Sequence, residues 1–224
     1  SDNNLFFSDQ NGTIFVYSLT TSKVIFEYNF YKKKYKKIKK SLNLIVENNI
    51  IYVSDNIGYL YAFNYRTNKI LWAKNYKIPF GSNLKLTKNS IIASNQNNSL
   101  FFFNKKNGEI LKLIPTEEVI VKNKFLNNLS LSQNTLFYLN TYGSLYSIDV
   151  KNFKINWFIN LNQSIQVDVG NLFSAMPIVN NSSRIVISSN LSTFIIDSNT
   201  GEIITKKNFS ASVRPIIQNN YVFL

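Results

Sequence analysis

The chain repeats one pattern of apolar and polar residues five times, and the pattern is that of a strand, a tight turn and a second strand. Its clearest copy runs from Ala62 to Trp72. The residues before the turn are aromatic or β-branched, as in Tyr59 to Phe63, which favours a strand. Each such run ends at a polar residue that can start a turn, namely Ser18, Asn64, Asn104, Asp149 and Asp197. Their spacings of 46, 40, 45 and 48 residues predict an array of identical supersecondary units.

The turn itself is marked by the position four residues after each of these polar residues. That position holds Ser22, Asn68, Gly108, Phe153 and Gly201. Gly and Asn tolerate a positive φ, so the series predicts a left-handed residue at this point of the turn. Phe153 departs from the rule and leaves the geometry of the fourth turn open.

Each unit contains two further strands. A strand follows the turn, and its third residue is Phe26, Trp72, Lys112, Trp157 or Thr205. A short apolar run closes each unit, as Leu42 to Val46 does, and a polar break then leads into the next strand. Four short strands per unit is the content of one propeller blade. Long helical patterns do not occur, so the sequence predicts an all-β protein.

These residues resemble the PQQ-type β-propeller repeats. The phrase from Ala62 to Trp72 is similar to the tryptophan-docking motif of that family, with Asn64 and Asn68 where the motif usually has Asp and Gly. The turns at Gly108 and Gly201 are closer to it, and Pro177 to Val179 resembles the strand that opens the next blade. The resemblance covers nearly the whole chain and implies a β-propeller of four-stranded antiparallel blades, about five blades plus a partial one.

The resemblance also implies how the chain is organised. Propellers of this family commonly close as rings of eight blades, so residues 1–224 are expected to form one propeller segment that belongs to a larger ring. A complete six-bladed ring, closed by pairing the two ends of the chain, is the alternative.

Trp72 and Trp157 are the chain's two tryptophans. The resemblance implies that each wedges between adjacent blades, where a ring of this size buries roughly 150–250 Å². Both are therefore expected to be structural docking residues. Lys112 and Thr205 occupy the same position and cannot fill that slot, so those junctions must pack differently.

The composition removes several kinds of chemistry. The chain has neither cysteine nor histidine, which excludes disulfides, thiolate nucleophiles and Ser-His systems. Its twelve acidic residues have structural interpretations, such as Asp149 and Asp197 at turns, and show no spacing suited to calcium. We therefore predict no catalytic, cofactor-binding or metal-binding residues and no enzymatic activity.

Charge is concentrated in one segment. Seven lysines between residues 32 and 40 supply seven of the thirteen net positive charges: Lys32, Lys33, Lys34, Lys36, Lys37, Lys39 and Lys40. They are candidates for contact with an anionic membrane surface or an acidic protein. A solvated loop that reflects AT-rich codon usage is the alternative, since the chain has 22 lysines but 3 arginines. Nucleic acid is not the expected partner, because no aromatic stacking platform accompanies the run.

Three functions fit these features. The preferred one is a protein-binding scaffold of the bacterial envelope, because within the PQQ-type repeats the chain is most similar to the BamB family of outer-membrane assembly lipoproteins. This resemblance implies a periplasmic, outer-membrane-associated protein that binds a β-barrel assembly machinery, with any lipid anchor upstream of Ser1. The alternatives are a fragment of a PQQ-dependent quinoprotein dehydrogenase and a sensor or adaptor domain.

Overall fold

A computed structural model describes residues 3–118, 126–162, 172–211, 213–219 and 221–224. They form antiparallel sheets whose strands follow one another in sequence. The first sheet contains β1 (Asn4–Ser8), β2 (Thr13–Ser18) and β3 (Lys23–Asn29). The second contains β4 (Leu42–Glu47), β5 (Ile50–Asp55), β6 (Tyr59–Asn64) and β7 (Lys69–Asn75). One 3-10 helix, η1 (Lys33–Tyr35), lies between these two sheets.

Three more four-stranded sheets and a final pair of strands follow. The third sheet contains β8 (Lys85–Leu86), β9 (Ser90–Ser94), β10 (Leu100–Asn104) and β11 (Ile110–Ile114). The fourth contains β12 (Asn128–Ser132), β13 (Thr135–Leu139), β14 (Ser144–Asp149) and β15 (Lys154–Asn160). The fifth contains β16 (Val179–Asn180), β17 (Arg184–Ser188), β18 (Thr193–Asp197) and β19 (Ile203–Lys207). The last pair is β20 (Ile216–Gln218) and β21 (Tyr221–Phe223).

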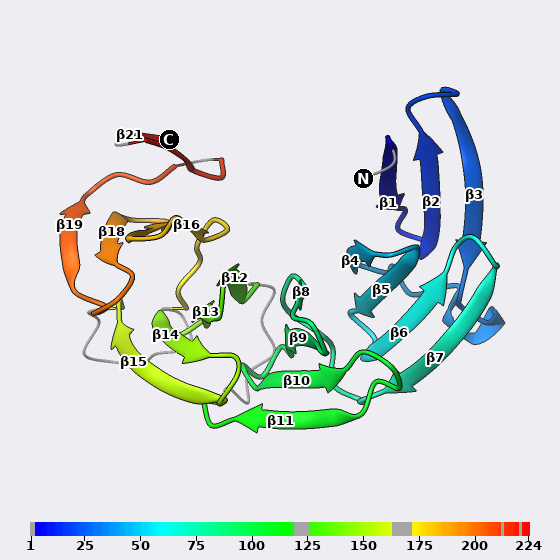
Figure 1. The fold of residues 1–224 in the computed structure, drawn as a ribbon, viewed down its shortest axis with the longest axis horizontal. Helices are drawn as coiled ribbons and strands as arrows, with labels where there is room; N and C mark the ends of the chain where they lie inside the picture. The colour runs from blue at the N-terminus through cyan, green and yellow to red at the C-terminus, as the bar shows by residue number, and fades with distance from the viewer. Residues whose placement is uncertain (1–2, 119–125, 163–171, 212, 220) are drawn as a thin grey trace.

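The sheets stand side by side as blades around an open centre (Figure 1). The first strands of the full blades, β4, β8, β12 and β16, lie on the inside of the arc, and the last strands, β3, β7, β11, β15 and β19, lie on the outside. Each of four buried apolar clusters joins two adjacent sheets. In one of them, Ile14 and Val16 of β2 meet Ile51 and Val53 of β5. The predicted all-β propeller of about five blades plus a partial one is confirmed.

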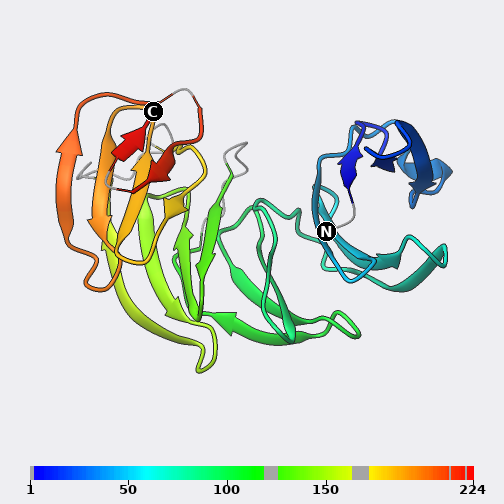
Figure 2. The same ribbon diagram turned by 45° about the horizontal axis from the view of Figure 1, so that its top comes forward.

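The two ends of the arc do not meet. In both views an open segment separates β1 from β21 (Figures 1 and 2). β1 pairs with β2, and β20 pairs with β21, in separate sheets. The six-bladed ring closed by pairing the chain ends is therefore wrong for these residues. Apolar side chains are exposed at both ends, among them Leu5 and Phe7 on β1, and Ile216 and Phe223 on the last pair of strands.

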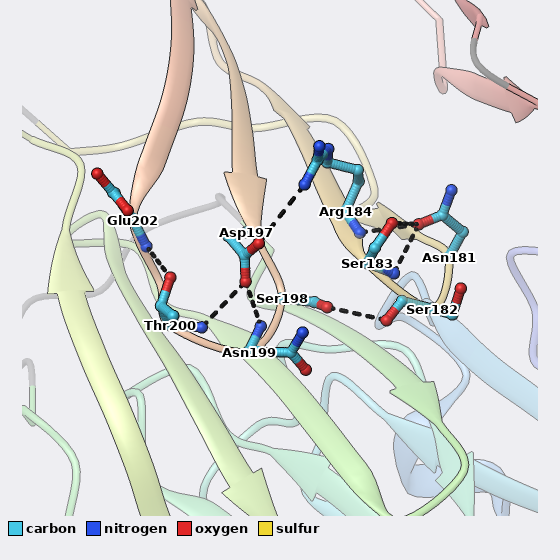
Figure 3. A network of polar contacts seen from close by, with 9 residues as sticks. All are labelled: Asn181, Ser182, Ser183, Arg184, Asp197, Ser198, Asn199, Thr200 and Glu202. Carbon is cyan, nitrogen blue, oxygen red and sulfur yellow. Dashed lines mark hydrogen bonds and ion pairs between the residues drawn. The ribbon is translucent and has the colours of Figure 1, made fainter.

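The repeated turn has one geometry throughout the chain. Its left-handed residue has a φ of 53° at Ser22, 54° at Asn68, 74° at Gly108, 56° at Phe153 and 79° at Gly201. The fourth turn therefore matches the others despite its bulky residue. Figure 3 shows the fifth turn, where the Asp197 carboxylate accepts hydrogen bonds from the backbone N–H groups of Asn199 at 2.8 Å and Thr200 at 3.1 Å.

These turn carboxylates predict a sensitivity to acid. Backbone N–H donors, Asn152 at one turn and Asn199 at the other, lower the pKa of Asp149 and Asp197. A carboxylate whose pKa is lowered by folding stabilises the fold at pH values above its pKa in the unfolded chain, about 3.9. This contribution is lost as the pH falls through its pKa in the folded chain. We expect the Asp149→Asn/Asp197→Asn variant to lose less stability than wild type between pH 7 and pH 3 in urea unfolding. Equal losses would contradict this account.

The junctions between blades follow a rule of complementary volumes. The pairing of the last two strands shifts register at the same place in each of the first five sheets. Just before the shift, facing residues are Val16 and Phe26, Ala62 and Trp72, Phe102 and Lys112, Ser147 and Trp157, and Ile195 and Thr205. A small residue, Ala62 or Ser147, faces each tryptophan. Phe102, the largest of the five facing residues, lies opposite Lys112.

The tryptophans lie against the left-handed glycine of the next blade. A Cβ atom on Gly108 would lie 2.5 Å from Cζ3 of Trp72, and one on Gly201 would lie 2.6 Å from Cε3 of Trp157. The Trp72 indole N–H donates to the Lys105 carbonyl at 2.9 Å. The Trp157 indole N–H is buried without a hydrogen-bond partner in the described part of the chain. Both rings therefore occupy space that only glycine leaves open.

The junction between the third and fourth sheets, where Lys112 takes the tryptophan position, is filled from the opposite side. Phe153 occupies the turn position that holds glycine opposite each tryptophan, and its ring meets Phe102 edge-on, with centroids 5.0 Å apart. Both rings belong to the apolar cluster between the third and fourth sheets. The turn therefore supplies the ring that Lys112 does not, which explains why Phe153 departs from the Gly/Asn rule.

Candidate interaction surfaces

The lysine run lies in the connection between β3 and β4, at one rim of the propeller. Its backbone forms η1 and the turn after it. The exposed side chains are Lys32, Lys33, Lys36, Lys37 and Lys39. The side chain of Lys34 lies outside the described residues. Lys40 differs from the rest because it is only 5% exposed.

Two turns hold the end of this connection in place. The Lys40 backbone N–H donates to the Gln10 carbonyl at 2.9 Å, which ties it to the β1–β2 turn. The Asn56 side chain accepts from Ser41 N–H at 2.9 Å and donates to the Lys39 carbonyl at 3.0 Å. Lys40 is therefore fixed at the junction between the first and second blades.

A buried carboxylate lies behind this connection. Asp55 is fully buried, and its Oδ2 accepts a 2.5 Å hydrogen bond from the Tyr31 hydroxyl. Its Oδ1 accepts from the backbone N–H groups of Ile57 and Tyr59, both at 2.8 Å. Burial raises the pKa of Asp55, while the hydrogen bonds from Tyr31 and the backbone oppose that rise. Burial also raises the pKa of Tyr31.

Asp55 belongs to a second repeated series that the turn analysis did not identify. Equivalent side chains at Asp9, Asn95 and Asn140 accept from the backbone N–H groups two and four residues later. Ser189 does so two and three residues later. The signal was present in the sequence, since these residues are spaced by 46, 40, 45 and 49. These side chains shape the rim that also carries the lysine run.

The outer strands present a different kind of surface. Each is the last strand in its sheet and has no neighbour on its outer side among the described residues. Large apolar side chains are exposed along them, including Leu71 on β7 (49%), Leu111 on β11 (46%) and Phe158 on β15 (60%). An open edge of this kind can pair with an added strand.

Four further acidic residues lie in turns and loops. Glu109 and Glu202 are exposed beside the turn glycines. Glu117 accepts a hydrogen bond from Ser144 Oγ at 2.5 Å, and Glu118 accepts one from Ser99 Oγ at 3.3 Å. In the described ranges no three His, Cys, Asp or Glu side chains gather as a metal site. No helix of the described residues has the length and apolar character needed to span a bilayer.

The blade repeat, its turns and its tryptophan junctions agree with a family comparison. Residues 33–224 match the model of the PQQ-type repeat family described as outer membrane protein assembly factor BamB. The chain belongs to this BamB family. A comparison with curated proteins finds no match.

Solved structures agree with the BamB-family fold. BamB from Moraxella catarrhalis has a TM-score of 0.79 and 11% identity over 99% of this chain and 66% of its own. The computationally designed protein Ika8 has a TM-score of 0.75 and 13% identity over 99% of this chain and 64% of its own. Sqt1 of Saccharomyces cerevisiae has a TM-score of 0.72 and 13% identity over 97% of this chain and 63% of its own. At these identities the likeness shows the fold alone, and the chain covers less than two thirds of each of these structures.

Proposed function

We propose that this chain is part of a non-enzymatic, periplasmic scaffold that binds other proteins and assists the assembly of outer-membrane β-barrel proteins. The match of residues 33–224 to the BamB family carries the proposal. In this proposal the chain is one segment of a larger, eight-bladed ring associated with the outer membrane.

The open outer edges support binding by strand addition. β11 has three large apolar side chains exposed by 45–49%, at Ile110, Leu111 and Leu113. Backbone groups on such an edge provide affinity to an extended segment, and apolar side chains add contact area. A β-barrel protein that is not yet inserted offers extended apolar segments of this kind.

Deletion of the gene tests the function. We expect cells without the full-length protein to contain fewer folded outer-membrane β-barrels, measured by heat-modifiable migration in gels, and wild type to restore them. The Leu111→Asp/Leu113→Asp variant is expected to fail, whereas Leu111→Val/Leu113→Val, which keeps the edge apolar, is expected to restore the level. Unchanged β-barrel levels after deletion would overturn the function. Restoration by the Asp variant would overturn the role of the β11 edge.

The exposed lysines are proposed to contact an anionic membrane surface. Lysines near such a surface contribute about 1 kcal/mol each, and the attraction is screened by salt. We expect the Lys32→Gln/Lys33→Gln/Lys37→Gln/Lys39→Gln variant to float less with anionic vesicles at 50 mM salt, with the difference shrinking at 500 mM. Identical flotation at low salt would leave the run as a solvated loop.

A further inference from the structure

A pocket lined by residues with polar or charged side chains opens beside the lysine run at the junction of the first two blades. It has a volume of about 440 Å³, and its lining residues are Asn11, Asn29, Tyr31, Lys36 and Lys40. These come from the β1–β2 turn, the end of β3 and the connection to β4. Ligand pockets commonly have volumes of about 300–1,000 Å³. The pocket is therefore large enough for a small charged group and the atoms attached to it.

Lys40 is a buried cation, and no described residue provides its counter-ion. Its ammonium group donates to the Tyr35 carbonyl at 2.5 Å and lies 5.2 Å from the centre of the Tyr31 ring. It forms no ion pair with a carboxylate of the described residues. An ammonium group has three protons, so a neutral carbonyl and a ring face leave it short of an anion. Lysine is almost never buried unless it is paired.

A second buried lysine, Lys105, has a carboxylate as its counter-ion. The side chain of Lys105 is 9% exposed, and its ammonium group pairs with the Glu47 carboxylate at 2.6 Å. Lys40 has comparable burial but lines an open pocket. The two acids of the same rim are engaged elsewhere, because Asp9 and Asp55 accept hydrogen bonds from the N–H groups of their own turns.

The pocket walls are held in a fixed arrangement. Asn29 donates to the Asn11 carbonyl at 3.2 Å and to Thr13 Oγ1 at 3.1 Å, and it accepts from Tyr31 N–H at 2.9 Å. The Lys40 stem packs against the β1–β2 turn, where a Cβ on Gly12 would lie 3.2 Å from its Cγ. These contacts engage the Asn29 amide, and the Tyr31 hydroxyl donates to Asp55, so the two lysine ammonium groups are the charged donors of the lining.

We propose that this pocket binds a phosphate group, held by the ammonium groups of Lys36 and Lys40. Two lysines match the double charge of a phosphate monoester, and lysine binds phosphate as a point charge. The phosphate can belong to a soluble ester or to a lipid headgroup. The site does not depend on the scaffold function, since it is built from the first two blades alone.

Titration of the full-length protein with glycerol 3-phosphate at constant ionic strength tests the site. We expect saturable binding that Lys36→Gln weakens by about tenfold, the effect of losing one charge-assisted hydrogen bond. Lys37→Gln makes the same charge change on the neighbouring lysine, which does not line the pocket, and is expected to bind like wild type. Equal weakening by both variants would overturn the site, because it would reduce the effect to overall charge.

Vesicles distinguish the lipid source. If glycerol 3-phosphate does not bind, we expect wild type to prefer vesicles with phosphatidic acid, whose headgroup is a phosphate monoester, over vesicles with the same surface charge from oleate. Lys36→Gln should abolish this preference and Lys37→Gln should keep it. No binding to glycerol 3-phosphate together with no preference for the phosphate lipid would overturn the proposal. Both variants leave Lys40 in place, so its bond to Tyr35 is retained.

Discussion

Gly108→Ala is expected to lower the free energy of unfolding by about 2–5 kcal/mol. The added Cβ would lie 2.5 Å from the Trp72 ring, and overpacking of this kind costs about 1–3 kcal/mol. Gly108 also has a φ of 74°, a conformation that costs a residue with a side chain about 1–2 kcal/mol more. Urea unfolding of the variant and of wild type measures the difference.

A double-mutant cycle separates the two costs. In the Trp72→Ala background the collision is gone, so Gly108→Ala should cost only the backbone term of about 1–2 kcal/mol. The same cost in both backgrounds would contradict docking of Trp72 on Gly108. Gly201→Ala with Trp157→Ala repeats the test at the other tryptophan junction, where the Cβ would lie 2.6 Å from the ring.

Asp55→Ala is expected to be similarly severe, at about 3–5 kcal/mol. The change removes the acceptor of two backbone N–H groups, those of Ile57 and Tyr59, and of the Tyr31 hydroxyl. A buried donor left without an acceptor costs about 1–3 kcal/mol. Thermal or urea unfolding at pH 7 measures the loss.

Asp55→Asn is the matched control. Asn95 and Asn140 make the same turn with an amide oxygen, so this variant keeps the acceptor of the two backbone N–H groups. It loses only the acceptor of the Tyr31 hydroxyl, at a cost of about 1–3 kcal/mol, which is less than the cost of Asp55→Ala. It also removes a titration. Burial raises the pKa of Asp55 above its value in the unfolded chain. Wild type should therefore lose stability as the pH rises from the unfolded-state pKa through the folded-state pKa, and Asp55→Asn should not. Equal losses for the Ala and Asn variants would contradict the role assigned to the turn acceptor.

The sequence predicted the blades because each blade's signals are local. The turn-starting polar residue, the left-handed position and the strand after it lie within one repeat, so their spacing is visible without any tertiary contact. The same spacing contains the Asp55 series, which could have been found from a polar residue followed three positions later by Gly12, Gly58, Asn98 or Gly143.

Contacts between blades could not be predicted in this way. Phe153 breaks the turn rule because of Phe102 and Lys112, residues of the preceding blade. Lys40 looks like its neighbours in the lysine run, yet the β1–β2 turn and Tyr31 bury it. Its separation from the exposed lysines depends on residues up to thirty positions earlier in the chain. Only the folded chain brings these residues together.

Retention of partners from envelope membranes tests the central claim most directly. The full-length protein, carried on a resin, is incubated with detergent-solubilised envelope membranes of its own cells, and mass spectrometry identifies what is retained relative to an unloaded resin. The account predicts specific retention of a β-barrel insertase and its accessory proteins. Retention of no envelope protein, with the protein itself fractionating to another compartment, would contradict the assembly-scaffold function while leaving the propeller fold intact.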